Sequence, residues 1–430
     1  MRTKKAVVAG VLTVGAVTAT LVALGPLDSP PRSAPPRVPA AAAGPVGTAE
    51  LTERLRAHPD DHRAWSALGV AEVEEARRTA DPAHYTKAQR ALERSLALRP
   101  AGPGNTDAMV GMGALANARH DFAGARRWGE RVRAARPDLW TVYPVLADAY
   151  TQLGDEPAAT TAVQRLLDLR PGLAAFTRAA YEFETHGRAP QAAEALERAR
   201  DVAGTPADVA FCLHRLGELA WERGDAQGAL RRYEEALRAD PDAHAALAGR
   251  AKARAALGRT DAALTDYETV TARVPLPEYV LELGELYESL GRAADARRQY
   301  DVLRAELRLF AANGASDDLT LGLFEADHGE PAAAVAALER EWSRRRPVMV
   351  ADALGWALHR AGRDAEALAY AEKAARYGWR TAPFLYHRGE IERALGRTEE
   401  ARAHLAEALR LNPHFSPLRA PLAAKALEEL

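Results

Sequence analysis

One pattern limits the fold of this chain more than any other: a small residue returns at intervals that are mostly 33 or 34 positions. A fixed period in this range is typical of solenoids, in which each unit packs only on its neighbours. The small residues are Gly69, Gly113, Ala147, Ala180, Gly217, Ala251, Gly284, Gly322, Gly355 and Gly389. An alanine follows each of them twelve positions later, except in the first unit, where an insertion displaces it to Ala88. The pattern predicts about ten units.

The spacing has a packing reason. Two antiparallel helices approach closely only where one side chain on each is very small. Between the two small columns, from the third unit on, lies a glycine that can adopt the left-handed conformation that ends a helix. These glycines are Gly154, Gly187, Gly224, Gly258, Gly291, Gly329, Gly362 and Gly396. A proline such as Pro241 often follows the second helix, so a unit is predicted to be helix, glycine turn, helix and proline break.

The pattern resembles the tetratricopeptide repeat family. The fifth unit shows it in Leu216, Gly217, Ala229, Tyr233, Ala236 and Pro241, and the tenth in Gly389, Ala401, Leu405, Ala408 and Pro413. The resemblance implies an all-α fold, a right-handed superhelical solenoid of about ten helix–turn–helix repeats over residues 62–413. Capping helices are expected at residues 48–61 and 414–430, because a terminal repeat has only one neighbour to cover it.

The N-terminus has the order of an export signal. Arg2, Lys4 and Lys5 precede an uncharged run, Ala6–Gly25. Residues 1–25 are therefore predicted to be either a retained membrane anchor or a signal peptide that is cleaved in the run Ala40–Ala43. Residues 26–47 are rich in proline and alanine and are predicted to be an extended linker. Both alternatives place the body of the protein outside the cytoplasm.

Composition and motifs exclude several classes of function. The net charge of −2 argues against nucleic-acid binding, and the single cysteine, Cys212, excludes an internal disulfide and any multi-cysteine metal site. The sequence contains no glycine-rich phosphate loop, nucleophile elbow or His-Glu-x-x-His pair. We therefore expect no enzymatic activity, no cofactor and no metal, and a buried structural role for Cys212.

The remaining function is binding. In this family the first helices line a concave groove that receives peptides, so residues of those helices that lie away from the packing columns are candidate binding residues. In the middle units these are Asp148, Glu184, Glu218, Glu222, Glu282, Glu285 and Glu288, together with Lys252. A groove of mainly acidic character would steer a basic segment of a partner protein into it. The alternative is that these are ordinary solvated charges.

The last units add a second group of candidates: Trp356, His359, Tyr386, Glu390 and Arg393. Exposed aromatic residues beside arginine are typical of binding hot spots. The alternative for both aromatic residues is packing between repeats.

The sequence thus predicts a monomeric protein-binding scaffold of the cell envelope, which contacts the membrane through its N-terminal segment only. An alternative comes from Leu51–Gly69, which looks like the opening of the repeat domains in bacterial cytochrome c maturation factors. An enzyme built on a helical solenoid is an alternative of another class, and no motif supports it.

Overall fold

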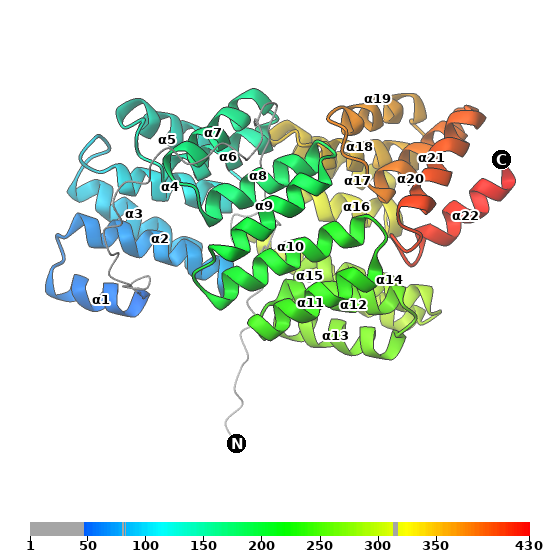
Figure 1. Cartoon of the computed structure of the whole chain (residues 1–430), viewed down its shortest axis with the longest axis horizontal. Coiled ribbons are helices and arrows are strands. Elements are labelled where there is room, and N and C mark those ends of the chain that lie inside the picture. Colours follow the sequence, from blue (N-terminus) through cyan, green and yellow to red (C-terminus); the bar gives the residue numbers. More distant parts are fainter. Residues whose placement is uncertain (1–46, 80, 82, 313–316) are drawn as a thin grey trace, which may run out of the picture.

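The computed structural model describes residues 47–79, 81, 83–312 and 317–430, which form 22 α-helices and no β-strand (Figure 1). Helix α1 (Thr48–Ala57) precedes ten helical hairpins, and α22 (Arg419–Glu429) follows them. The first helices of the hairpins are α2 (His62–Thr79), α4 (Thr106–Ala118), α6 (Val142–Leu153), α8 (Leu173–Thr185), α10 (Pro206–Glu222), α12 (His244–Ala256), α14 (Pro277–Ser289), α16 (Asp318–His328), α18 (Val348–Arg360) and α20 (Ala382–Ala394). The second helices are α3 (Ala83–Leu98), α5 (Phe122–Ala135), α7 (Glu156–Leu169), α9 (Ala189–Asp201), α11 (Ala226–Ala239), α13 (Thr260–Arg273), α15 (Ala293–Ala312), α17 (Pro331–Arg344), α19 (Asp364–Ala375) and α21 (Thr398–Leu411). The predicted all-α repeat solenoid is confirmed.

The turns inside the hairpins mostly follow the prediction. Seven of the eight turn glycines have φ between 68° and 76°, the left-handed region in which a side chain is strained. Gly329 is the exception: its φ is −139°, so the expected left-handed turn is wrong there. In the second hairpin, which lacks a glycine at this place, His120 adopts a φ of 62°. After several of these turns an aspartate caps the second helix, as Asp225 does by accepting the Gly228 N–H at 2.7 Å.

Both columns of small residues lie where the paired helices touch. The ten column alanines are exposed by 2% or less. A Cβ atom added at Gly217 would lie 2.5 Å from the ring of Tyr233, and one at Gly389 would lie 2.7 Å from Leu405. Larger side chains at these places would therefore push the helices apart, as the period suggested.

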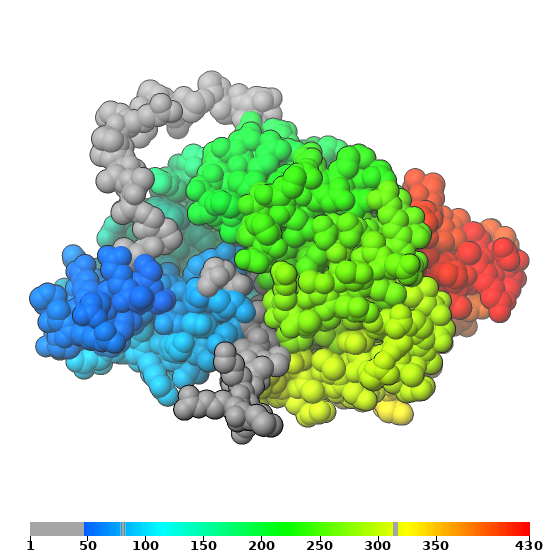
Figure 2. Space-filling model, turned by 90° about the horizontal axis from the view of Figure 1, so that it is seen from below, coloured from blue at the N-terminus to red at the C-terminus, as the bar shows by residue number. Residues whose placement is uncertain are grey.

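The core follows the chain from hairpin to hairpin. One cluster of buried residues extends from Met109 to Ala246, a second from Leu247 to Phe324 and a third from Ala326 to Ala426. Seen from below, the green surface of the middle hairpins lies between the blue first hairpin and the red last hairpin (Figure 2). Each hairpin is thus stabilised by its neighbours, as in other solenoids.

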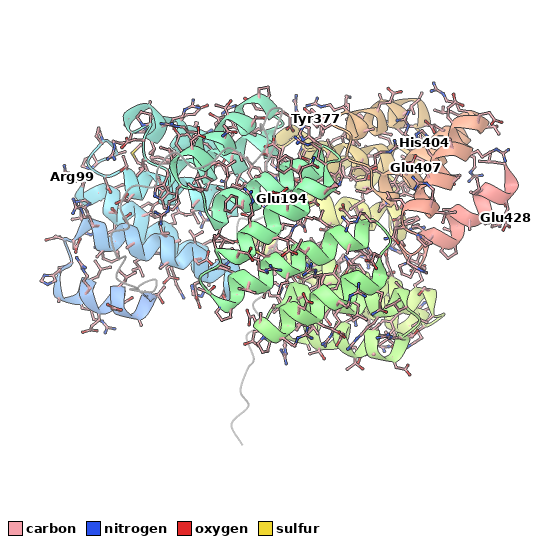
Figure 3. The ribbon with its side chains drawn as sticks, in the orientation of Figure 1. Arg99, Glu194, Tyr377, His404, Glu407 and Glu428 are labelled. Carbon is pink, nitrogen blue, oxygen red and sulfur yellow. The ribbon has the colours of Figure 1, made fainter. Side chains whose placement is uncertain are left out.

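The solenoid winds far enough to meet itself. The backbone N–H of Arg346, after α17, donates a hydrogen bond of 2.9 Å to the carbonyl of Gln152 at the end of α6. The side chain of Asn412, after α21, donates one of 2.8 Å to the carbonyl of Trp221 in α10, 191 residues away. Between them, the ring of Tyr377 lies 5.4 Å from that of His186 after α8, where the orange helices meet the α8–α9 hairpin (Figure 3).

We call this contact the seam. It joins the turns of the third, fourth and fifth hairpins to the segments that follow α17, α19 and α21. Glycine is required there for a second reason, because a Cβ atom at Gly187 would lie 2.5 Å from the carbonyl oxygen of Gly378, and one at Gly224 would lie 2.6 Å from that of Leu411. Four turn glycines away from the seam have no atom within 4 Å of such a Cβ: they are Gly258, Gly291, Gly362 and Gly396.

The predicted signal or anchor, residues 1–25, and all but the last residue of the predicted linker, residues 26–47, lie outside the described residues. None of the described helices is both long and apolar enough to span a membrane.

Candidate functional site

Pairs of acidic and basic side chains connect the first helices of successive hairpins. In each pair an acidic residue on one first helix contacts a basic residue on the next. The pairs are Asp148–Arg178, Glu184–Arg215, Glu218–Lys252, Glu285–His328 and Asp352–His387, with N–O distances of 2.6, 2.6, 3.0, 3.1 and 2.8 Å. The charged faces of the first helices are therefore adjacent along the solenoid.

The segment between α21 and α22 lies beside α10, α12 and α14 and borders two open cavities. The first has a volume of about 250 Å³ and is lined by Glu218, Glu222 and Lys252 and by four aromatic residues, Trp221, Trp379, Phe384 and Phe415. We call it the aromatic cavity. The second, the acidic cavity, has a volume of about 360 Å³ and lies between α14, with Glu282 and Glu285, and the segment Pro413–Pro417. Trp221, Lys252 and Phe415 line both cavities, so the two are neighbours.

Lys252 stands between the two cavities and is already paired. Its Nζ lies 3.0 Å from Oε2 of Glu218 and 5.2 Å from the centre of the Trp221 ring. The hydroxyl of Tyr233, held between α10 and α12, donates a further hydrogen bond of 2.5 Å to Glu218. Burial opposes ionisation of Glu218, but Lys252 and His214 overcome it and lower the pKa of Glu218 to about 2. This pair is a fixed part of the wall.

Glu222, one turn further along α10, has no ion-pair partner within the described ranges. Its Oε2 accepts a hydrogen bond of 3.4 Å from Nε1 of Trp379, a residue from the other side of the seam. Burial, and after it the charge of Glu184, raise the pKa of Glu222 to about 8. The aromatic cavity therefore holds a carboxyl group whose negative charge is poorly compensated.

The acidic cavity shows the same imbalance. Glu282 accepts a hydrogen bond of 3.1 Å from the hydroxyl of Tyr267 and makes no ion pair with any described residue. Burial raises the pKa of Glu282 even though Lys252 opposes the shift. Glu285 is 3.1 Å from Nε2 of His328, whose other ring nitrogen is 3.3 Å from Glu288. The two cavities together contain more carboxyl groups than basic side chains.

Comparison with known proteins supports the repeat pattern of helical hairpins with small residues at their contacts. Family models described as tetratricopeptide repeat match residues 214–267, 249–308 and 382–415. These ranges cover the fifth, sixth, seventh and tenth hairpins, and the other hairpins have the same architecture. This is a tetratricopeptide repeat protein. Its repeats are a scaffold for protein interactions. No curated protein matches the chain.

Solved structures that resemble this tetratricopeptide repeat protein do so at low identity. A tetratricopeptide repeat protein from Parabacteroides merdae is 23% identical over 60% of this chain and 97% of that chain, with a TM-score of 0.34. Human IFIT1, solved as a dimer with PPP-AAAA, is 14% identical over 84% of this chain and 87% of that chain, with a TM-score of 0.45. A Naa15/Naa10 structure bound to HypK-THB is 17% identical over 85% of this chain and 60% of that chain, with a TM-score of 0.28.

The expected solvent-facing acidic stripe needs correction. Glu184 is only 4% exposed and binds Arg215 of the next hairpin, so it is not a surface residue. Asp148 and Glu218 are likewise engaged by the next hairpin. The physical reason is that first helices of neighbouring repeats lie close enough for an acid on one to meet a base on the other. Glu222 and Glu282 are the candidates that line a cavity without such a pair.

The second candidate group in this tetratricopeptide repeat protein also needs correction. Trp356 and Tyr386 are 2% and 4% exposed, so the expectation that they form an exposed hot spot is wrong. The indole N–H of Trp356 donates to Asp327 at 3.0 Å, and its ring stacks on that of His387 at 4.4 Å. Both rings pack between repeats, which was the alternative interpretation.

The other three residues of that group make local contacts. His359 lies 2.6 Å from Asp364 in its own hairpin, and Arg393 donates to Glu390 at 2.7 Å on the same helix. None of them lines either cavity. The structure therefore does not bring the late candidates together with Glu222 and Glu282.

Sequence reasoning missed the aromatic residues of the cavities: Trp221, Trp379, Phe384 and Phe415. Trp379 and Phe415 lie in connections between helices, where the repeat pattern assigns no role. Their meeting with α10 depends on the seam, which joins residues 157 to 193 positions apart. A hint was the presence of large aromatic residues in segments that a solenoid normally leaves exposed.

Cys212 is buried, and burial raises the pKa of its thiol to about 12, as for a packed structural cysteine. Within the described part of the chain no three histidine, cysteine or acidic side chains are grouped as metal ligands.

Proposed function

We propose that this scaffold binds a basic segment of a partner protein in the aromatic and acidic cavities. The observation that carries the proposal is the charge imbalance of their walls. Glu222 and Glu282 line the cavities without an ion pair to any described residue, while the lysine of the wall, Lys252, is bound to Glu218.

Electrostatics supports a cationic occupant. A buried carboxylate without a compensating charge is costly, and the cost shows as the raised pKa values of Glu222 and Glu282. A cation placed between these groups would favour their ionised forms and gain Coulomb energy in a partly dry site. Low-dielectric walls of one sign also attract the opposite charge from solution.

The rim of the acidic cavity indicates what accompanies the positive charges. Leu290, on the rim, is 41% exposed, and Leu286, Pro417 and Pro421 lie around it. Apolar surface beside an acidic floor suits a segment in which basic and aliphatic residues alternate. The proposed ligand is therefore a short peptide segment of that composition.

The test uses a fluorescein-labelled peptide of alternating arginine and leucine residues, and the same peptide with glutamate in place of arginine. The double variant Glu282→Gln with Glu285→Gln keeps hydrogen-bond acceptors while removing two charges from the acidic cavity. Fluorescence anisotropy should show binding of the basic peptide only, weakened about tenfold or more in the double variant, with a loss that shrinks as salt rises.

The matched control is Glu399→Gln with Glu400→Gln, which removes the same two charges from exposed positions on α21. This variant should bind like the wild type. Equal affinity of the cavity variant and the wild type would refute the proposal. An equal loss in both variants would show that the peptide responds to net charge and not to the cavities.

We also propose, from the basic start and the uncharged run Ala6–Gly25, that the scaffold works outside the cytoplasm. Protease added to intact spheroplasts should then digest the body of the protein. Membrane fractionation with a carbonate wash distinguishes a retained anchor from a cleaved signal, since only the anchored form remains in the pellet. Protection from external protease would contradict both forms.

A further inference from the structure

We infer that the aromatic cavity is a specific pocket for the cationic head of one arginine or lysine side chain of the partner segment. This inference rests on the proposed function and adds to it a defined subsite. The pocket combines Trp221, Trp379, Phe384 and Phe415 with the carboxyl group of Glu222.

The chemistry of the lining selects an organic cation. Aromatic faces attract ammonium and guanidinium groups through the negative charge above the ring, and a neighbouring carboxylate adds a full charge. A volume of about 250 Å³ gives room for a long side chain, since a water molecule takes only about 30 Å³ in the liquid. A small inorganic cation would gain little from four aromatic walls.

The protein already uses this combination once in the same cavity. The ammonium group of Lys252 lies 5.2 Å from the centre of the Trp221 ring and 3.0 Å from Glu218. Glu222 and Trp379, joined by a hydrogen bond of 3.4 Å, supply a carboxyl group and an indole ring for a second cation. Glu222 has no ion pair within the described residues, so its carboxyl group is available to ionise against an incoming cation.

The pocket is assembled only where the solenoid meets itself. Trp221 and Glu222 come from α10, whereas Trp379 lies between α19 and α20, Phe384 lies in α20 and Phe415 follows α21. The ring of Trp379 also makes a T-shaped contact with that of Tyr181 in α8, with ring centres 6.1 Å apart, which holds Trp379 across the seam. A closed seam is therefore part of the binding site.

The probe is a capped single residue, N-acetyl-arginine-N-methylamide, and its control is the corresponding citrulline compound, which is neutral and nearly the same shape. Nitrogen-15 spectra resolve the indole N–H groups of the seven tryptophans. The arginine probe should shift the indole signal of Trp379, which contacts Glu222, and should leave that of the exposed Trp140 in place. The citrulline compound should shift neither.

Glu222→Gln supplies the test by mutation, because glutamine can still accept the hydrogen bond from Trp379. Its affinity for the arginine probe should fall about tenfold or more. Glu428→Gln, at an exposed position on α22, should change nothing. A second measurement is proton release: because the pKa of Glu222 is about 8 without ligand, a bound cation should expel a proton at pH 7. Calorimetry in two buffers of different ionisation enthalpy would detect it, and Glu222→Gln should abolish it.

An equal response to citrulline, or an unchanged affinity in Glu222→Gln with a normal melting curve, would overturn the pocket. The experiments distinguish a failure of this pocket from a failure of the proposed function. If the arginine–leucine peptide is weakened by the Glu282 and Glu285 variant but not by Glu222→Gln, the cavities bind a basic segment without this pocket. If the single-residue probe binds through Glu222 but the double variant has no effect, the pocket stands and the wider proposal fails.

Discussion

Nη1 of Arg345 donates a hydrogen bond of 2.7 Å to Oε1 of Gln152, although 193 residues separate the two in the sequence. Arg345 is only 2% exposed and is also paired with Glu341 on α17. The backbone N–H of Arg346 bonds to the carbonyl of the same glutamine. Gln152 thus anchors the eighth hairpin to the third, and it ties together two parts of a solenoid that simple nearest-neighbour packing would leave independent.

Replacing Gln152 with alanine should therefore destabilise more than a local contact. The change leaves Nη1 of a buried arginine without its acceptor, which costs about 1–3 kcal/mol. Urea unfolding of Gln152→Ala measures the loss. Gln164→Ala, which removes only a pair with Asp168 on the surface of α7, should lose much less. Similar losses in the two variants would show that the seam adds no stability.

The turn glycines give a second measure of the seam. Gly224 and Gly258 have φ values of 75° and 72°. The left-handed backbone conformation should therefore destabilise an alanine at either position by the same amount, about 1–2 kcal/mol. Only at Gly224 would the new methyl group meet a carbonyl oxygen across the seam, that of Leu411 at 2.6 Å. Gly224→Ala should therefore lose about 1–3 kcal/mol more than Gly258→Ala and show a larger radius of gyration by X-ray scattering. Equal unfolding free energies and equal radii would contradict this.

The repeat fold could be predicted because its determinants are local. Ala229 and Gly217 belong to the same hairpin, and their small size and spacing are visible in a single unit. The seam could not be predicted in this way. Whether Gly224 reaches Leu411 depends on small rotations between hairpins that add up over five repeats. The sequence of a single repeat does not reveal this accumulated rotation.

The candidate site was predicted in part for the same reason. The first-helix positions of Glu222 and Glu282 follow from the period, and both residues line the cavities. The period does not reveal that Glu184 finds Arg215 on the next helix, nor that Trp379 faces Glu222 from 157 residues away. Pairing between repeats and closure of the solenoid decide which carboxyl groups are left without a basic partner among the described residues.

The alanine column predicts a sharp difference between two otherwise similar substitutions. Ala229 is fully buried between α10 and α11, so leucine there should force the helices apart and cost about 1–3 kcal/mol. Ala336 lies at an exposed position of α17, and leucine there should change stability by about 0.5 kcal/mol or less. Thermal melts of Ala229→Leu and Ala336→Leu check this. A wild-type melt for Ala229→Leu would argue against close helix contact at this column.

The pair of Glu218 and Lys252 predicts non-additive mutations. Glu218→Gln leaves the ammonium group of Lys252 in the cavity wall without its carboxylate and should cost about 3 kcal/mol. Lys252→Met leaves Glu218 without its cation and should cost a similar amount. The double variant removes both charges, so its loss should be smaller than the sum of the two single losses, as a double-mutant cycle in urea would show. Additive losses would mean that the two charges act independently.

The raised pKa of Glu222 predicts how stability depends on pH. Its value of about 8 in the folded protein exceeds the ordinary 4.5 because of burial and the charge of Glu184. Below pH 4.5 both the folded and the unfolded chain keep this proton, whereas between pH 4.5 and about 8 unfolding releases it. Glu222 therefore destabilises the fold increasingly as pH rises through that window.

Glu222→Gln lacks this titration, so its unfolding free energy relative to the wild type should rise between pH 5 and pH 8. One proton changes the free energy of unfolding by at most about 1.4 kcal/mol for each pH unit, or about 4 kcal/mol between pH 5 and pH 8. The expected rise is about 1–2 kcal/mol, below that limit. Other buried carboxyl groups titrate in both proteins and largely cancel from the difference. Glu428→Gln, at an exposed position, should give a difference close to zero at both pH values. If the difference for Glu222→Gln is equally flat, Glu222 is ionised in the folded protein and its charge is compensated.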